Sequence, residues 1–234
     1  MPPTTIGLLL FPNVTQLDLT GPLQVFSRLP TAKVYLVAKT MAPVSSDTVL
    51  MLPPTIDFAA CPQLDVICVP GGAGTDDLVG DEETLAFLRQ QAERAHYITS
   101  VCTGALVLGA AGLLRGYRAT THWSALEDLA AFGAIAERSR VCVDHNRISG
   151  GGVTAGIDFA LTLAELLGDR ATAQAIQLML EYNPSPPFDA GAPDTAPQEV
   201  VAMVKQRMQG ARQRRIAAVR RAADRLSRGG EPAT

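Results

Sequence analysis

Residues 97–114 read YITSVCTGALVLGAAGLL, and this stretch decides the fold. The apolar run Tyr97–Val101 predicts a strand buried on both faces, which is typical of parallel sheets covered by helices. The run Thr103–Leu114 predicts a helix that follows at once. A strand that passes directly into a helix is the repeating unit of α/β proteins. Cys102 lies at the junction.

The same alternation extends to both sides of this unit. Further strands are predicted over Thr5–Leu10, Lys33–Ala38 and Asp65–Val69, and a hairpin over Val141–Val143 and Arg147–Ile148. Helices are predicted over Leu17–Leu29 (interrupted at Gly21-Pro22), Glu82–Ala95, Ser124–Phe132, Thr154–Leu167 and Ala171–Met179. Residues 43–58 are rich in turns and predict a small antiparallel excursion. The alternation predicts a doubly wound, mostly parallel α/β sheet flanked by helices.

The C-terminal quarter differs in composition from the rest. Five prolines lie within Tyr182–Pro197, and residues 205–234 carry 9 Lys and Arg against 2 Asp and Glu, or +7, whereas residues 1–204 carry 11 against 21, or −10. We expect one α/β domain over residues 1–182, then a Pro-rich arm and a basic C-terminal helix over 183–234. A basic tail can bind nucleic acid, but no helix-turn-helix pair is present. The expectation is a basic amphipathic helix that packs on the acidic body and contains no catalytic group.

Composition limits the protein class. Hydrophobic residues make up 47% and charged residues 18% of the 234, which excludes a largely disordered chain. No apolar run reaches the roughly 18 residues of a membrane span, and Met1–Leu10 lacks the basic flank of a signal peptide. A cytoplasmic protein with neither membrane nor nucleic-acid partners is expected.

The four cysteines have no metal-binding or disulfide spacing, so free thiols and no metal site are expected. Cys61, Cys68 and Cys142 are interpreted as packing residues. Cys102 is the candidate nucleophile, because a strand-to-helix turn at the carboxyl end of a sheet is where open α/β folds place their sites. The helix N-terminus is expected to favour the thiolate and lower the thiol pKa.

Other candidate residues fall in the loops around this turn. The glycine-rich turns Pro70–Gly74 and Gly150–Gly156 let backbone approach a ligand closely, or serve only as turns. Asp18 lies among apolar residues after the first strand; it is either a helix cap or a desolvated proton donor with a raised pKa. His122, followed by Trp123, is either a general base or a structural hydrogen-bonding residue.

The stretches PGGAG (70–74), SVCTGALVLGAAGLLRGYRATTHW (100–123) and GGGVTAGIDFAL (150–161) resemble the class I glutamine-amidotransferase-like (ThiJ/PfpI) superfamily, which has a flavodoxin-like fold. Two branches share these motifs: the sensor domains of AraC-type regulators and the isocyanide hydratases. An AraC regulator is expected to carry about a hundred residues of helix-turn-helix segment after its sensor. The segments Gln16–Pro22 and LMLEYNPSPPFDAGAPDTAP (178–197) are similar to the isocyanide hydratases.

This resemblance implies a hydro-lyase that converts isocyanides and water to N-substituted formamides through a cysteine thioimidate, without metal or organic cofactor. It implies a homodimer, with Cys102 as nucleophile, Asp18 as proton carrier and Thr103 beside them. The implied substrate-binding residues are Gly72, Gly151, Val153, His122 and Trp123. Two alternatives remain open: a stand-alone ligand- or redox-sensing domain, and another thiol-dependent hydrolase or glyoxalase-like activity.

Overall fold

A seven-stranded sheet forms the centre of the molecule, of which the computed structural model describes residues 3–228. The strand order is β10-β11-β7-β6-β1-β2-β5, and all neighbours are parallel except the hairpin β10–β11. The strands are β1 (Thr4–Leu9), β2 (Ala32–Ala38), β5 (Ile56–Asp57), β6 (Val66–Val69), β7 (Tyr97–Val101), β10 (Val141–Asp144) and β11 (Arg147–Gly150). This topology confirms the predicted doubly wound, mostly parallel sheet.

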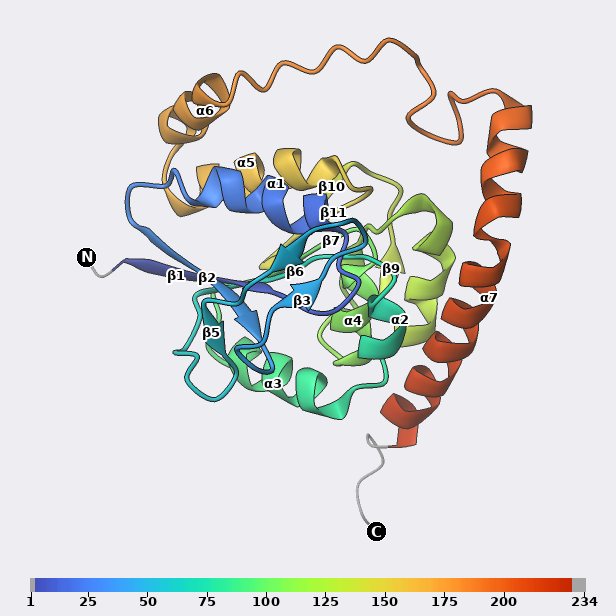
Figure 1. Cartoon of the computed structure of the whole chain (residues 1–234), viewed down its shortest axis with the longest axis horizontal. Helices are drawn as coiled ribbons and strands as arrows, with labels where there is room; N and C mark the ends of the chain where they lie inside the picture. Colours follow the sequence, from blue (N-terminus) through green and yellow to red (C-terminus); the bar gives the residue numbers. More distant parts are fainter. Residues whose placement is uncertain (1–2, 229–234) are drawn as a thin grey trace.

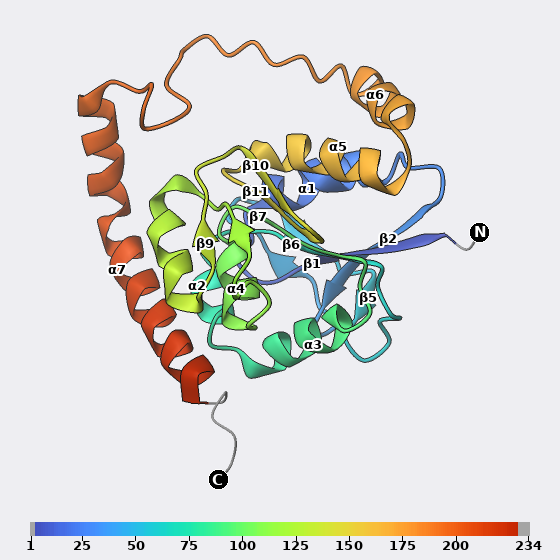
Figure 2. The ribbon, with the colours of Figure 1, turned by 180° about the vertical axis from the view of Figure 1, so that it is seen from behind.

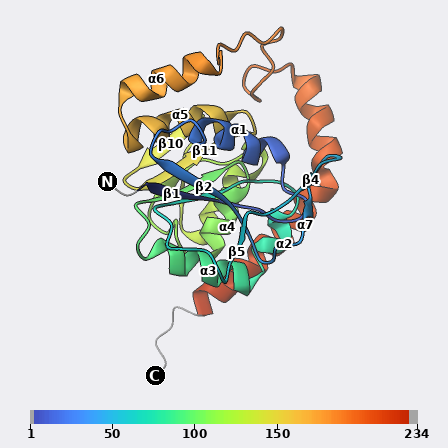
Figure 3. The same ribbon diagram turned by 60° about the vertical axis from the view of Figure 1, so that its left-hand side comes forward.

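Helices cover both faces of the sheet (Figures 1 and 2). One face carries α1 (Gln16–Phe26) and α5 (Ala155–Leu167), and α6 (Arg170–Met179) packs on α5; the other carries α3 (Glu82–Ala92) and α4 (Gly104–Ala110). Figure 3 shows the sheet between these two layers. The central strands are apolar on both sides because both faces are covered, and all four residues of β6 are buried.

Two predicted helices differ from the structure, one because of tertiary packing and one because of a local glycine. Pro22 does not interrupt α1, because the helix packs against α5 so closely that a Cβ added to Gly156 would lie 3.3 Å from Pro22 Cδ. The helix predicted over Thr103–Leu114 ends at Ala110, and Gly112 follows with φ +79°. Positive φ is the usual end of a helix and favours glycine.

In two further regions the structure contains short helices or strands that the sequence pattern did not predict in full. The segment predicted as a helix over Ser124–Phe132 is a 3-10 helix, η1 (Trp123–Phe132). Within residues 43–58, β3 (Val44–Ser45) and β4 (Met51–Leu52) pair antiparallel as predicted, but β5 leaves this excursion and extends the main sheet beside β2. A second small pair, β8 (Arg118–Ala119) with β9 (Ile135–Ala136), flanks η1.

The C-terminal arm crosses the molecule and leads to a long helix, α7 (Gln198–Arg228), along one edge (Figure 1). The second half of α7 packs on η1, α4 and the short helix α2 (Thr75–Leu78), with Ala218, Val219 and Ala222 buried. The tail is therefore helical as expected; residues 229–234 of the predicted segment lie outside the described part. In residues 3–228 no helix has the length and hydropathy needed to cross a membrane.

Candidate active site

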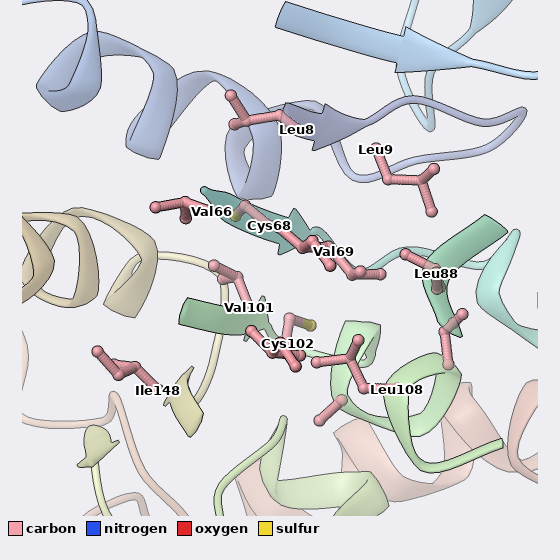
Figure 4. Close-up of a cluster of buried hydrophobic side chains, with 14 of the residues drawn as sticks. Leu8, Leu9, Val66, Cys68, Val69, Leu88, Val101, Cys102, Leu108 and Ile148 are labelled. Carbon is pink, nitrogen blue, oxygen red and sulfur yellow. The ribbon is translucent and has the colours of Figure 1, made fainter. Parts of the chain in front are cut away.

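Cys102 sits at a sharp turn between β7 and α4 with φ +54°, an unusual value for a residue with a side chain. Its N–H donates to Gly150 O at 3.0 Å, and its carbonyl accepts from Thr121 Oγ1 at 2.7 Å. Figure 4 shows the side chain directly after Val101 and near Val69 of the adjacent strand. The surrounding structure therefore fixes the turn from both sides, as a nucleophile elbow requires.

Asp18, on α1, is fully buried and interacts with the Cys102 thiol. The Gly71 N–H donates to its Oδ2 at 2.9 Å, while its Oδ1 is buried without a protein partner. Burial raises the pKa of Asp18 to about 7, against the lowering effects of the Cys102 and Gly71 hydrogen bonds. A carboxyl with this pKa takes up and releases a proton near neutral pH.

The thiol environment differs from the expectation of a lowered pKa. Burial, and then the negative charge of Asp18, raise the pKa of Cys102, and the Thr103 amide lowers it only in part. The short helix after the turn does not outweigh these effects. Two buried groups that both become anionic repel each other, so the pair Asp18–Cys102 carries at most one negative charge near neutral pH. A thiolate forms when Asp18 holds the proton.

Thr103 connects the elbow to the loop after β6. Its Oγ1 accepts from the Gly72 N–H at 3.0 Å and from Thr75 Oγ1 at 3.1 Å. The Gly72 amide therefore orients Thr103. Because its N–H is engaged in this hydrogen bond, it does not point to a substrate, in contrast to the substrate-binding part expected for Gly72. Gly72 itself has φ +133°, and an added Cβ would lie 2.4 Å from Thr15 N, so no larger residue fits this turn.

The backbone of Gly71 approaches both members of the pair closely. A Cβ added there would lie 2.6 Å from Thr103 N, 2.7 Å from Asp18 Oδ2 and 2.8 Å from Cys102 Cβ. Gly71→Ala should therefore displace the carboxyl and the thiol and reduce turnover by at least about 100-fold, since misplacement near 1 Å has such an effect. The control is Gly210→Ala on α7, which should leave turnover unchanged. Equal rates for both variants would contradict this account.

Four of the predicted substrate-binding residues line one cavity of about 540 Å³. His122, Trp123, Gly151 and Val153 lie in its wall together with Thr121, whose hydroxyl binds the Cys102 carbonyl. Thr121 therefore connects the cavity to the elbow, although neither Cys102 nor Asp18 is among the residues that line it. Its outer wall contains residues 191–194 of the arm.

The arm contributes a wall that the sequence analysis missed. Asp194 accepts two hydrogen bonds from Arg138 Nη1, each at 3.0 Å, and this contact holds the arm at the cavity. Arg140, also in the cavity wall, donates to Asp158 Oδ2 at 2.6 Å. Local sequence carries no signal for these pairings, because Arg138 and Asp194 are 56 residues apart. The prolines of the arm indicated an extended segment, but not where it packs.

His122 faces the cavity but has no interaction with Cys102 among the contacts of residues 3–228. Its Nδ1 lies 2.8 Å from Ser124 Oγ and accepts from the Ser124 N–H at 3.3 Å. Burial, and then the charge of Arg215, lower its pKa to about 4. The ring is therefore neutral near pH 7. Of Asp18 and His122, only Asp18 contacts the thiol and has a pKa near neutral pH.

The remaining cysteines are placed as packing residues. Cys68 lies in β6 and Cys142 in β10, both buried, and Cys61 is half-buried in a loop; all are free thiols. In the described residues 3–228, no group of three or more His, Cys, Asp or Glu side chains is arranged to hold a metal ion.

The buried Asp18 carboxyl should give the fold a distinct pH dependence. Its pKa rises from 3.8 to about 7 on folding, so the native state holds a proton that the unfolded state has lost between these values. This contribution to the free energy of unfolding is fully present below about pH 4 and falls by about 1 kcal/mol per pH unit until about pH 7. Asp18→Asn should remove it, so the variant gains stability over the parent as the pH rises. Denaturant unfolding at pH 4 and pH 8 measures both proteins, and a constant difference would contradict the assignment.

Known proteins resemble this chain over most of its length. An isonitrile hydratase from Pseudomonas putida is 57% identical over 95% of this chain and 97% of the relative. A crystal structure of a ThiJ/PfpI family protein from Pseudomonas syringae, 47% identical, superposes with a TM-score of 0.91 over 94% of this chain and 91% of that one. The transcriptional regulator GbdR from Pseudomonas aeruginosa is 31% identical over 77% of this chain, but over 51% of its own length.

The family comparison covers the whole sheet and the elbow. The model of the DJ-1/PfpI family matches residues 4–166, from the first strand to the end of α5. The matched part includes Asp18, both glycine-rich turns and Cys102. The chain belongs to the DJ-1/PfpI family.

Proposed function

We propose that this chain catalyses the hydration of isocyanides to N-substituted formamides at Cys102. The observation that carries the proposal is the buried Cys102–Asp18 pair, in which the carboxyl has a pKa of about 7. Thr121, in the wall of a cavity of about 540 Å³, donates to the Cys102 carbonyl and so connects that cavity to the pair. The 57% identity to an isonitrile hydratase over 95% of the chain supports this substrate class. Thr103 and Gly71 hold the pair in place through the contacts described above.

The first half of the reaction forms a carbon–sulfur bond. The Cys102 thiolate attacks the terminal isocyanide carbon, which is electrophilic, and a lone pair develops on that carbon. Asp18, which received the thiol proton, donates it to the carbon. The product is a neutral thioimidate, R–N=CH–S, and an Asp18 carboxylate. One proton has moved from sulfur to carbon through the carboxyl.

The second half consumes water. The Asp18 carboxylate takes a proton from a water molecule, and the water oxygen attacks the thioimidate carbon. The nitrogen takes up that proton, the carbon–sulfur bond breaks, and the thiolate leaves as the carbonyl forms. The hydroxyl proton returns to the Cys102–Asp18 pair, which restores the starting state and releases R–NH–CHO. Addition of one water to one isocyanide balances every atom.

The test is the production of formamide from a simple alkyl or aryl isocyanide, followed by NMR. Many turnovers per protein chain are expected. A second candidate, a ligand- or redox-sensing domain, rests on the match to GbdR. Stoichiometric oxidation of Cys102 with no formamide would favour that candidate and reject hydration. Turnover of a different thiol-dependent substrate instead would favour the third alternative.

We also propose a cytoplasmic homodimer. The four free cysteines are consistent with a reducing compartment. Large apolar side chains are exposed on α6, the arm and the first half of α7, where Leu178 is 80%, Phe188 79% and Met203 46% exposed. A second copy covering this surface would remove it from water.

The surface predicts the result of one double substitution. Leu178→Glu with Phe188→Glu should yield monomers, because the charges would be buried against the second copy. Size-exclusion chromatography with light scattering gives the mass, and Val49→Glu, a 97% exposed position on the β3–β4 turn, is the control. A dimer that survives the double substitution would place the interface elsewhere.

A further inference from the structure

The C-terminal helix places a buried guanidinium between two short helices, α2 and η1, near the candidate site. Arg215, on α7, and Asp18 are the two buried charged residues of the described part of the chain. Arg215 Nε donates to Asp76 Oδ1 at 3.2 Å, and its Nη1 donates to Ser124 Oγ at 3.4 Å. Asp76 belongs to α2, after the first glycine-rich turn, and Ser124 belongs to η1, at the cavity. A side chain of the tail therefore joins α2, whose Thr75 contacts Thr103, to η1, whose Trp123 and Leu126 line the cavity.

One end of this connection reaches His122. A guanidinium can only donate, so Ser124 Oγ accepts from Arg215 and directs its own proton to His122 Nδ1, 2.8 Å away. The Ser124 N–H also points to Nδ1. An Nδ1 that accepts hydrogen bonds leaves the proton of the neutral ring on Nε2. The neighbouring Cδ2 faces the cavity at Gly152, where an added Cβ would lie 3.8 Å from it.

The other end reaches the elbow. Thr75 immediately precedes Asp76, and its hydroxyl lies 2.7 Å from Gly72 O and 3.1 Å from Thr103 Oγ1. Thr103 is the residue after Cys102. The ion pair of Arg215 with Asp76 is largely shielded from water, with 9% and 16% of the two side chains exposed. Removal of Arg215 would therefore leave the half-buried Asp76 carboxylate without its partner, which is unfavourable.

We infer that Arg215 is a positioning residue for the proposed reaction: through Ser124 it orients His122 as an uncharged Nε2–H donor in the substrate cavity, and through Asp76 it holds α2 against Thr103. The inference rests on the proposed function. It assigns to the C-terminal helix a part in the site that the sequence analysis did not expect. The donor that results suits a polar atom of the bound substrate or formamide.

Histidine NMR tests the connection independently of activity. The chain contains three histidines, and His96 and His145, with 72% and 81% of their side chains exposed, serve as internal references. In the parent, His122 should titrate near its lowered pKa of about 4, and His122→Asn assigns its signal. Arg215→Met should move this titration toward the ordinary value of 6.5, because a nearby positive charge is lost. Arg215→Lys retains the charge and should retain most of the lowering.

Steady-state kinetics supply the second readout. Arg215→Met should lower kcat/KM by about 10- to 100-fold, mostly through KM, since it misplaces the cavity wall and not the nucleophile. Arg220→Met, at an exposed position of the same helix, is the matched control and should match the parent. Ser124→Ala removes the hydroxyl link between Arg215 and His122, while the residue 124 N–H can still donate to Nδ1 and the Arg215–Asp76 pair stays intact. It should raise KM even if Arg215→Met fails to fold.

The outcomes separate the inference from the proposed function. If the His122 titration is unchanged in both Arg215→Met and Ser124→Ala, or if kcat/KM of Ser124→Ala and Arg220→Met is equal, the inference is overturned. A parent protein that forms no formamide, yet shows the shifted His122 titration in Arg215→Met, would reject the proposed reaction while retaining the connection. Unchanged labelling of Cys102 in these variants would show that the nucleophile itself is undisturbed.

Discussion

Replacement of Cys102 by serine or alanine should abolish formamide formation, with turnover reduced by at least about 10⁴-fold as for other nucleophile deletions. A serine hydroxyl at this turn remains protonated near pH 7, because its proton is far less acidic than that of a thiol. Neither variant can form the thioimidate. The measurement is the initial rate of formamide production, with circular dichroism to confirm the fold.

The matched control is Cys142→Ala. Cys142 is buried in β10, away from the elbow, so its replacement should alter the free energy of unfolding by about 1 kcal/mol and leave the rate unchanged. Mass spectrometry of the parent, quenched during turnover, should find a substrate adduct on Cys102. More than a few per cent of parental activity in Cys102→Ala would remove this thiol from the reaction.

Asp18→Asn should separate thiol reactivity from hydration. The rate of formamide formation should fall by about 10²- to 10⁴-fold, because an amide cannot carry the proton to the isocyanide carbon. The Cys102 thiol should instead become more reactive toward an alkylating agent at a fixed pH. Its pKa is raised by the charge of Asp18, and the substitution removes that charge. Two assays on one variant should thus change in opposite directions.

Two companion variants define the position of the proton. Asp18→Glu should also be poor, since one added methylene displaces the carboxyl in a site that has no free space at Gly71. His122→Asn should be milder, because the ring is neutral and has no contact with the thiol among the described residues. Normal turnover by Asp18→Asn together with an inactive His122→Asn would assign the proton to histidine and contradict the mechanism.

The sequence alone determined the architecture and the chemistry-bearing turn. Apolar runs that pass directly into helices define a buried parallel sheet, because only strands covered on both faces can be apolar throughout. The same local pattern placed Cys102 at a strand end. The glycines at positions 71 and 72 also indicate, from the local sequence, a turn at which other groups approach the backbone closely. Hydrophobic periodicity and the residue preferences of turns depend on only a few neighbouring residues, so both can be recognised in the sequence.

The tertiary structure alone decided the protonation states and the walls of the site. The thiol pKa, expected to be lowered by a helix end, is raised because burial and Asp18 act on it from other elements. Pro22 stays inside a helix because α5 packs against it. The arm reaches the cavity through Arg138 and Asp194, and Arg215 reaches Ser124 across 91 residues. Desolvation and charge pairing depend on which distant segments meet in space, and no local pattern of residues encodes those meetings.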